Sequence, residues 1–191
     1  MRAGSLFIIS GPSGAGKGTL VDRLVTRVPG LQVSTSATTR APRPGEIDGD
    51  DYVFLSSDEF QRRVDEGAFL EWAEVHGNRY GTLRSTVEER LSKGCDVILE
   101  IDPQGAFQVK DVLPSSVLIF ITAPSMTELE RRIRKRGAES DDEVRMRLET
   151  AERELRLVGT YHHVVENDDV SLATERLAEI VESHRSHEGC R

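Results

Sequence analysis

Cysteines and long apolar runs are scarce in this sequence, and their scarcity excludes two classes of protein. Its 191 residues include only two cysteines, Cys95 and Cys190, which lie far apart, so neither a zinc knuckle nor a disulfide-stapled secreted fold is indicated. The apolar run at residues 6–9 is far shorter than a signal-peptide core or the roughly 20 residues of a membrane-spanning helix. We therefore expect a cytoplasmic protein with no membrane partner.

Basic residues are also fewer than acidic residues. Lys and Arg number 25 against 33 Asp and Glu, which gives a formal net charge of −8. Because DNA and RNA backbones are held by basic surfaces, we expect no nucleic-acid partner, although small anions can still bind where cations gather locally. The length lies within the range of roughly 100 to 200 residues typical of one domain, so a single unit is expected and the oligomeric state stays open.

Short apolar runs alternate with stretches of helical periodicity along the chain. The runs at 6–10, 97–101 and 117–121 have no polar alternation, which predicts strands buried on both faces of a parallel sheet. Capping-box patterns begin two of the expected helices, Ser125 with Glu128 and Ser140 with Glu143. Apolar spacing predicts helices at 16–28, 58–66, 83–93, 127–136, 141–158 and 172–184. The alternation predicts an α/β fold.

The amino-acid composition changes after the first predicted helix, and the alternation stops there. Residues 35–51 are rich in Thr, Pro, Gly and charge, and six of the ten aromatic residues follow between 52 and 80. We interpret this segment as an inserted subdomain.

A glycine-rich segment, GPSGAGKGT at 11–19, directly follows the first apolar run and begins the first helix. That context is typical of a P-loop, in which glycines let backbone N–H groups converge on phosphate oxygens and Lys17 adds a charge for the outer phosphates. One position departs from the pattern: Gly18 stands where a Ser or Thr hydroxyl usually meets Mg²⁺, and Thr19 follows one step later. The segment predicts phosphate binding and leaves the placement of magnesium open.

A second anion site is indicated by the segment TTRAPRPGEIDGDDYVF at 38–54. Two guanidinium groups, Arg40 and Arg43, together with the phenol of Tyr52, could grip one phosphate. A solvated charged loop explains the same residues equally well.

Two acidic residues in apolar surroundings, Glu71 and Asp102, would each need a partner if they are buried. Guanine offers one, because carboxylates can accept from its N1–H and N2 amino group, and its O6 calls for a donor such as Ser36 or Thr82. For each acid alone, a core salt bridge or a helix cap is an equally good explanation.

Seven segments in order resemble the guanylate kinase family, over about residues 5–183. They are the P-loop, the arginine and tyrosine segment at 38–54, FLEW (69–72), GNRYGT (77–82), EIDPQG (100–105), RRIRKRGAE (131–139) and VVENDD (164–169). The resemblance implies a bacterial-type enzyme that transfers the γ-phosphoryl group of ATP to GMP. It also implies a P-loop NTPase fold with a core (1–34, 97–131 and 151–185), a GMP-binding insertion (35–96), a short helical lid (132–150) and a tail (186–191).

The same resemblance implies roles for individual positions. ATP would be bound by Gly11, Pro12, Ser13, Gly14, Ala15, Gly16, Lys17, Gly18 and Thr19, with Asn167 and Asp168 near the purine. GMP would be bound through its phosphate by Arg40, Arg43, Tyr52 and Tyr80, and through guanine by Ser36, Glu71, Thr82 and Asp102. Mg²⁺ would arrive with ATP and be held mostly through water by Thr19, Glu100 and Asp102. Thr82 stands where Ser is common, and Glu100 where a shorter Asp is common.

A basic cluster at 131–136, with Arg147 one segment later, is the densest positive charge in this acidic chain. Arginines that arrive with a closing lid can stabilise the charge spread over a transferring phosphoryl group. The resemblance implies that Arg132, Arg136 and Arg147 act in this way, beside Lys17 and Arg40. For Arg131 and Arg134 we favour a solvated helix face paired with nearby glutamates.

A rival interpretation is a non-catalytic guanylate-kinase-like interaction module. Such modules typically have degraded P-loops, whereas Lys17, both loop arginines and the lid arginines are present here.

Overall fold

The computed structural model describes residues 3–75, 77–135 and 140–185. Its elements in chain order are β1 (Leu6–Ser10), α1 (Lys17–Arg27), β2 (Leu31–Val33), β3 (Ala37–Thr38), β4 (Val53–Phe54), α2 (Ser57–Asp65), β5 (Phe69–Val75), β6 (Asn78–Leu83), α3 (Arg84–Ser92), β7 (Asp96–Glu100), α4 (Pro103–Val112), β8 (Val117–Thr122), α5 (Met126–Lys135), α6 (Asp141–Leu155), the 3₁₀ turn η1 (Val158–Thr160), β9 (His163–Glu166) and α7 (Val170–His184). No helix within these residues is long and apolar enough to cross a membrane.

A five-stranded parallel sheet forms the core, in the order β2-β7-β1-β8-β9. The three predicted strands are its centre, where β1 pairs with β7 on one side and β8 on the other. All five residues of β1 are buried, as expected for a strand covered on both faces. The α/β fold with a parallel-sheet core is therefore confirmed.

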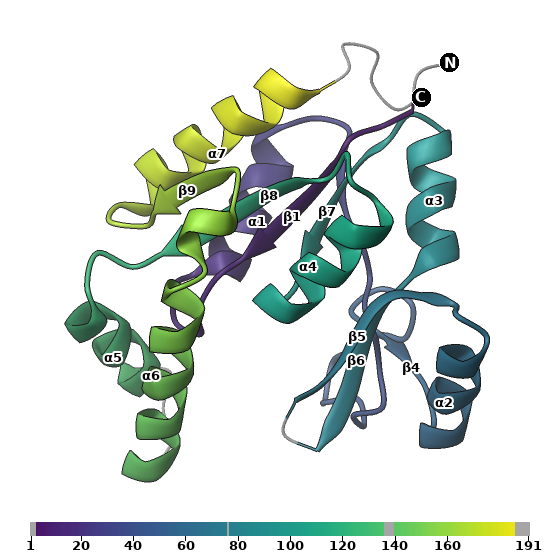
Figure 1. Ribbon diagram of the computed structural model, residues 1–191, viewed down its shortest axis with the longest axis horizontal. Helices are drawn as coiled ribbons and strands as arrows, with labels where there is room; N and C mark the ends of the chain where they lie inside the picture. The colour runs from purple at the N-terminus through teal and green to yellow at the C-terminus, as the bar shows by residue number, and fades with distance from the viewer. Residues whose placement is uncertain (1–2, 76, 136–139, 186–191) are drawn as a thin grey trace.

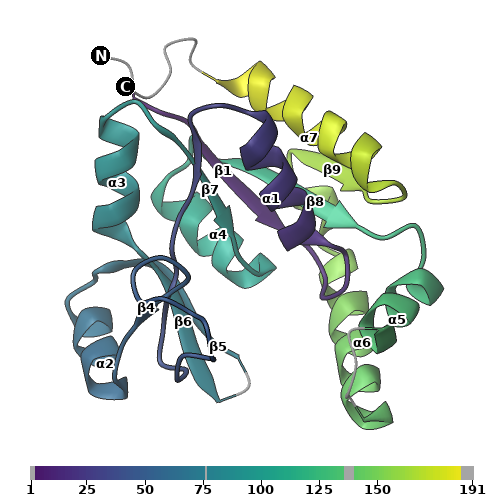
Figure 2. The ribbon, with the colours of Figure 1, turned by 180° about the vertical axis from the view of Figure 1, so that it is seen from behind.

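Helices cover both faces of this sheet (Figures 1 and 2). Phe7 and Ile9 of β1 pack in a cluster with α1 and α7, whereas Leu6 and Ile8 pack in a second cluster with α3 and α4. Each such side chain stabilises the fold by roughly 1.5–3 kcal/mol when it is fully buried.

Helix α4 is the one helix of the described residues that the sequence analysis did not predict. Pro103 and Gly105 near its start resemble breakers, but Pro is favoured in the first helical turn because its missing N–H would have no partner there. Asp102 caps this helix, since its Oδ1 accepts from the backbone N–H of Gly105 at 2.7 Å. The six predicted helices are confirmed to within three residues at each described end. The largest difference is at the end of α6, which ends at Leu155 and not at 158, where the 3₁₀ turn η1 begins.

A second, four-stranded sheet in the order β4-β3-β6-β5, together with α2, forms a separate unit within the segment 35–96. Its small apolar cluster includes Phe60 and Phe69, whose rings stack at 4.5 Å. Helix α3, at the end of the same segment, buries Val87 in the core instead.

Helices α5 and α6 form a third unit around Leu129, Ile133, Val144 and Ala151. The predicted capping box of Ser140 and Glu143 is confirmed. At the start of α5, Ser125 Oγ accepts from the N–H of Glu128, but the Glu128 carboxylate accepts from arginines instead of completing the box. Figure 1 shows that the four-stranded unit and the α5–α6 unit project from the same end of the core sheet.

Candidate functional site

The P-loop connects the carboxyl end of β1 to the start of α1 at Lys17. Gly14 and Gly16 adopt positive φ angles of 86° and 91°, and a Cβ on Gly11 would lie 2.1 Å from the carbonyl oxygen of Ile121. Only glycine fits such positions without strain. The turn leads directly into the N-terminus of α1, and the start of a helix attracts anions through its backbone N–H groups and its dipole.

Lys17 folds back over this turn. Its Nζ donates to the carbonyl oxygens of Gly11 at 2.5 Å and Pro12 at 3.2 Å. The loop forms one wall of a cleft of about 320 Å³, and the opposite wall includes Glu100, Asp102 and Glu154. Lys17 therefore lies where it can reach phosphates entering the cleft.

A second pocket, of about 400 Å³, lies on the other side of the P-loop, against α5. It is lined by Gly14, Gly16, Thr19, Arg131, Arg132, Lys135, Asn167 and Val170. Asn167 is only 2% exposed, and its Nδ2 donates to the Ala15 carbonyl oxygen at 2.8 Å. Its Oδ1 has no hydrogen-bond partner among the described residues. A purine amino group is a suitable donor to such an oxygen.

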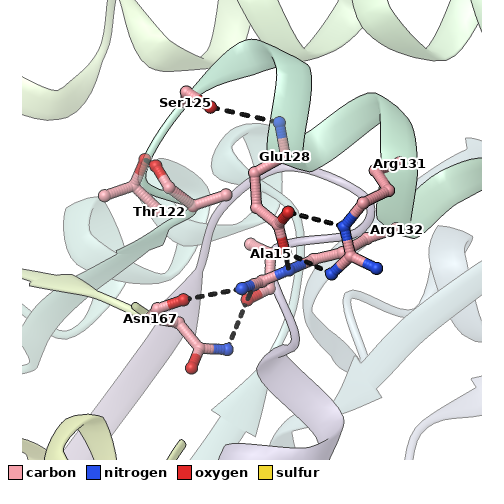
Figure 3. A network of polar contacts seen from close by, with 8 residues as sticks. Ala15, Thr122, Ser125, Glu128, Arg131, Arg132 and Asn167 are labelled. Carbon is pink, nitrogen blue, oxygen red and sulfur yellow. Dashed lines mark hydrogen bonds and ion pairs between the residues drawn. The ribbon is translucent and has the colours of Figure 1, made fainter. Parts of the chain in front are cut away.

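Arg132 ties α5 to this pocket (Figure 3). Its guanidinium donates to the Asn167 carbonyl oxygen at 2.9 Å, to the Ala15 carbonyl oxygen at 3.4 Å and to the Glu128 carboxylate at 2.6 Å. Arg131 lines the same pocket but pairs with Glu128 from an exposed position. Asp168 is partly exposed and pairs with Arg176 at 3.2 Å, outside the residues that line the pocket.

Arg147 of α6 reaches the P-loop directly, because its Nη1 lies 3.2 Å from Ser13 Oγ. Arg134 pairs with Glu130 and Asp141 on the exposed face of the helices, in agreement with the solvated interpretation. Arg136 lies outside the described residues.

A third pocket, of about 250 Å³, opens between the four-stranded unit and the end of β7. It is lined by Ser36, Tyr52, Glu71, Ala73, Val75, Tyr80, Gly81, Glu100, Ile101 and Asp102. Glu100, Ile101 and Asp102 also line the P-loop cleft. The two cavities therefore meet at the carboxyl end of β7.

Glu71 is the buried acid of this third pocket, with 6% of its surface exposed. Burial raises the pKa of its carboxyl to about 7, with a smaller contribution from Asp102, while the hydrogen bond from Thr82 opposes the shift. Thr82 Oγ1 donates to Glu71 Oε1 at 2.6 Å. Thr82 is not among the residues that line the pocket, and its hydroxyl proton is used in the hydrogen bond to Glu71. Ser36, in contrast, lines the pocket.

Of the phosphate-binding candidates, Tyr52 and Tyr80 line this pocket, and Arg40 lies against Tyr52. The rings of Tyr52 and Tyr80 are 6.2 Å apart, and the Arg40 guanidinium lies 5.3 Å from the Tyr52 ring centroid. Arg40 pairs with Glu46, and Arg43 is exposed in the same loop. Arg40, Tyr52 and Tyr80 are therefore brought together, with Arg43 nearby in sequence.

Possible magnesium ligands are divided between two pockets. Thr19 lines the pocket against α5, whereas Glu100 and Asp102 line the P-loop cleft. The carboxylate oxygens of Glu100 lie 3.7 and 3.8 Å from the place where a Cβ on Gly18 would be. Among the described residues, no group of three or more His, Cys, Asp or Glu side chains could hold a metal ion alone. One or two carboxylates beside substrate phosphates nevertheless fit magnesium, which keeps most of its waters.

Glu154 is a cleft residue that the sequence analysis missed. It lies in α6, and burial raises the pKa of its carboxyl to about 7, while Lys17 opposes the shift. The sequence pattern that indicates it is spacing. Glu154 lies seven positions after Arg147, so both side chains lie on one face of a helix.

Comparisons with known proteins agree with this geometry. The sequence profile of the guanylate kinases matches residues 3–184. A guanylate kinase of Desulfitobacterium hafniense is 52% identical over 178 residues, which cover 93% of this chain and 89% of that protein. A guanylate kinase of Thermotoga maritima is 45% identical over 183 residues, covering 96% of this chain and 88% of that protein.

Solved structures extend the agreement to three dimensions. The crystal structure of guanylate kinase from Anaplasma phagocytophilum has a TM-score of 0.79 at 34% identity, covering all of this chain and 90% of that one. The resemblance predicted from the motifs is confirmed, and the chain belongs to the guanylate kinase family.

Proposed function

We propose that this chain transfers the γ-phosphoryl group of ATP to GMP, giving ADP and GDP, across the junction of its two cavities. The observation that carries the proposal is that residues 100–102 line both the P-loop cleft and the pocket of Glu71. A nucleotide in each cavity would bring its phosphates to the same place. The reaction belongs to purine nucleotide metabolism, and we propose a cytoplasmic location with no nucleic-acid or membrane partner.

The acceptor needs little chemical activation. A phosphate monoester has its second pKa near 6, so GMP is largely a nucleophilic dianion at neutral pH. One of its phosphate oxygens attacks the γ-phosphorus as the bond to the ADP oxygen breaks. Catalysis then depends on alignment and on charge stabilisation.

The chain's cations would supply that stabilisation. Lys17 belongs to the P-loop, and Arg147 and Arg132 contact the loop at Ser13 and Ala15. We assign a catalytic role to these three, to Arg40 and to Arg136. Arg43, Tyr52 and Tyr80 would complete the grip on the GMP phosphate, and Asn167 with Asp168 would lie near the ATP purine.

Guanine selection would rest on Glu71. In its ionised form this carboxylate can accept from the N1–H and the N2 amino group, while Ser36 donates to O6. Adenine lacks that donor edge and would leave the buried Glu71 carboxylate with only its hydrogen bond from Thr82, and unmet acceptors in a buried site are costly. Asp102 lines the same pocket while its Oδ1 caps α4, and we propose that its carboxylate also accepts from guanine.

Guanylate kinases generally use Mg²⁺, which neutralises phosphate charge when it is bound with ATP. We propose that Glu100 and Asp102 meet it mostly through water, with Thr19 in a supporting role. The intact P-loop and the paired cavities do not favour the rival interpretation as a non-catalytic interaction module.

A coupled assay of ADP release tests the proposal. ATP with GMP should give turnover, and ATP with AMP should give almost none. Lys17→Ala should lower turnover by roughly a hundredfold or more, because an aligned charge in a water-excluded site contributes several kcal/mol. Equal efficiency with AMP and GMP, or full activity in folded Lys17→Ala, would contradict it.

A further inference from the structure

Glu46 pairs with Arg40, the arginine that lies against Tyr52 of the third pocket. Its Oε1 accepts from Arg40 Nη2 at 2.8 Å, and its Oε2 accepts from Arg40 Nη1 at 3.0 Å. Both side chains are mostly buried, with 15% and 18% of their surfaces exposed. A two-point contact between a carboxylate and a guanidinium sets the plane of the guanidinium as well as its position.

The same carboxylate closes the loop that carries both candidate arginines. Oε2 also accepts from the backbone N–H of Arg43 at 2.6 Å, and the backbone N–H of Glu46 donates to the Arg43 carbonyl oxygen at 3.1 Å. Arg40 and Arg43 hold the pKa of the Glu46 carboxyl below its ordinary value, so it is ionised at neutral pH. The Glu46 side chain therefore holds both the Arg40 guanidinium and the backbone at Arg43.

The remaining donors of Arg40 point to the purpose of this arrangement. A guanidinium carries five N–H donors. The Glu46 carboxylate accepts one hydrogen bond from each terminal nitrogen, and the Ala41 carbonyl oxygen accepts from the second N–H of Nη1 at 2.7 Å. The Nε–H and the second Nη2–H lie on the other edge of the group. Tyr80 also faces this edge, since a hydrogen bond with Tyr80 contributes to the raised pKa of Arg40, and the edge suits two oxygens of a phosphate.

The aromatic surroundings place that guanidinium at the pocket. Arg40 lies over the ring of Tyr52, and both Tyr52 and Tyr80 line the pocket. Glu46 is the main cause of the raised pKa of Arg40, and Tyr80 contributes less.

We propose that Glu46 is a positioning residue that presents one edge of Arg40 to the phosphate of the acceptor nucleotide. This inference rests on the proposed function, because it takes GMP as the ligand of the third pocket. Glu46 makes no contact with the phosphate itself and acts through Arg40 and the turn at Arg43. A carboxylate that merely occupied the phosphate position would compete with GMP and have the opposite effect on affinity.

Calorimetric titration of the full chain with GMP and with guanosine tests the proposal. Glu46→Gln replaces one acceptor oxygen with an amide that faces a guanidinium N–H. We expect the GMP dissociation constant to rise about tenfold or more, which is about 1.4 kcal/mol. For guanosine, which has no phosphate, the dissociation constant of the variant should lie within about twofold of that of the protein without the substitution, because Glu71 is not changed.

A matched control is available in the same loop. Asp50→Asn removes the same charge from an exposed position and should leave both affinities unchanged. Thermal unfolding of each variant reports whether the fold is kept, and Glu46→Ala provides a second variant if Glu46→Gln unfolds.

Three results would overturn the inference while the proposed function stands: unchanged GMP affinity, tighter GMP binding, or an equal loss for GMP and guanosine. The first would show that Arg40 needs no support, the second that Glu46 competes with phosphate, and the third that the whole pocket is distorted. If the protein without any substitution binds no GMP, both the proposed function and this inference are overturned.

Discussion

Glu71 is a residue whose burial opposes the charge that its proposed role requires. Its pKa of about 7 means that a fall from pH 8 to pH 6 takes the carboxyl from mostly ionised to mostly protonated. The protonated form presents a hydroxyl to guanine N–H donors and loses an acceptor. We therefore predict that guanosine affinity falls roughly tenfold over this range.

Guanosine is the right probe for this prediction, because the phosphate of GMP titrates near pH 6 itself. Calorimetry at several pH values measures the effect, and Glu71→Gln should bind guanosine weakly at every pH. A flat profile for the unchanged protein would contradict the role of Glu71. For stability the sign is opposite: ionisation of the buried acid costs free energy, so its stabilising contribution is complete below about pH 4.5 and is lost by about pH 7.

Gly18 permits a second prediction for a single residue. A Cβ there would make ordinary contacts with the Glu100 carboxylate at 3.7 and 3.8 Å, so Gly18→Ser fits the structure. If magnesium is held mainly by ATP phosphates and water, the added hydroxyl should change the Mg²⁺ concentration for half-maximal turnover by roughly threefold or less. A fall by orders of magnitude in the folded variant would mean that the native site lacks a ligand.

Residues within one segment are the ones whose placement the sequence predicts best. The P-loop lies between β1 and α1 as expected, because glycine spacing and a neighbouring helix start are local signals. The bond from Thr82 to Glu71 joins two strands across a sheet, and Arg132 reaches backbone more than thirty residues away. Such partners depend on tertiary packing, which composition and spacing do not encode.

Among the elements, α4 is the helix for which the apolar spacing gives no prediction. Its Pro and Gly are common in loops, but a proline in the first turn and an Asp cap favour a helix start. The sequence leaves three interpretations of Asp102 open: a core salt bridge, a helix cap or a ligand of guanine. The structure shows the cap, and the position of Asp102 beside the third pocket keeps the role as a ligand of guanine as a proposal.

Two substitutions at Asp102 separate these roles. Asp102→Asn keeps an oxygen for the cap and should change the free energy of unfolding by less than about 0.5 kcal/mol, whereas Asp102→Ala should cost about 1 kcal/mol. Both should weaken GMP if the carboxylate faces guanine, because each removes its charge. Urea unfolding and GMP titration measure the two effects, and full GMP affinity in Asp102→Asn would leave the cap as its role.

At the scale of the whole molecule, an ion pair joins the two ends of the core. Arg185 Nε donates to Asp96 Oδ2 at 2.8 Å, and Asp96 Oδ1 accepts from the backbone N–H of Ser5 at the same distance. Arg185 also donates to the Pro29 carbonyl oxygen. The contact links the segments before β1 and after α7 to the start of β7.

Because Asp96 is almost fully buried, loss of its partner leaves a charge without compensation. We predict that Arg185→Ala lowers the free energy of unfolding by about 3 kcal/mol. Arg145→Ala, which breaks an exposed pair with Asp142, should cost less than about 0.5 kcal/mol. Urea denaturation compares them, and equal effects would show that burial of the pair is unimportant.

The arrangement of the units leads to the last prediction. Arg40 belongs to the four-stranded unit and Arg147 to the α5–α6 unit, and both units project from the same end of the core sheet (Figure 1). Charges on two separate projections can act on one phosphoryl group only if the projections approach each other, and that approach also excludes water as a competing acceptor. We therefore predict that binding of a bisubstrate analogue, adenosine and guanosine joined by a phosphate chain, brings both units closer together.

Small-angle X-ray scattering measures this change. The radius of gyration should fall toward a value of about 16 Å, which is expected for a compact chain of this length. ATP alone should give a smaller change, because it occupies only the cleft and the pocket beside the P-loop. Identical profiles with and without the analogue, at concentrations that saturate binding by calorimetry, would show that the arginines act without closure.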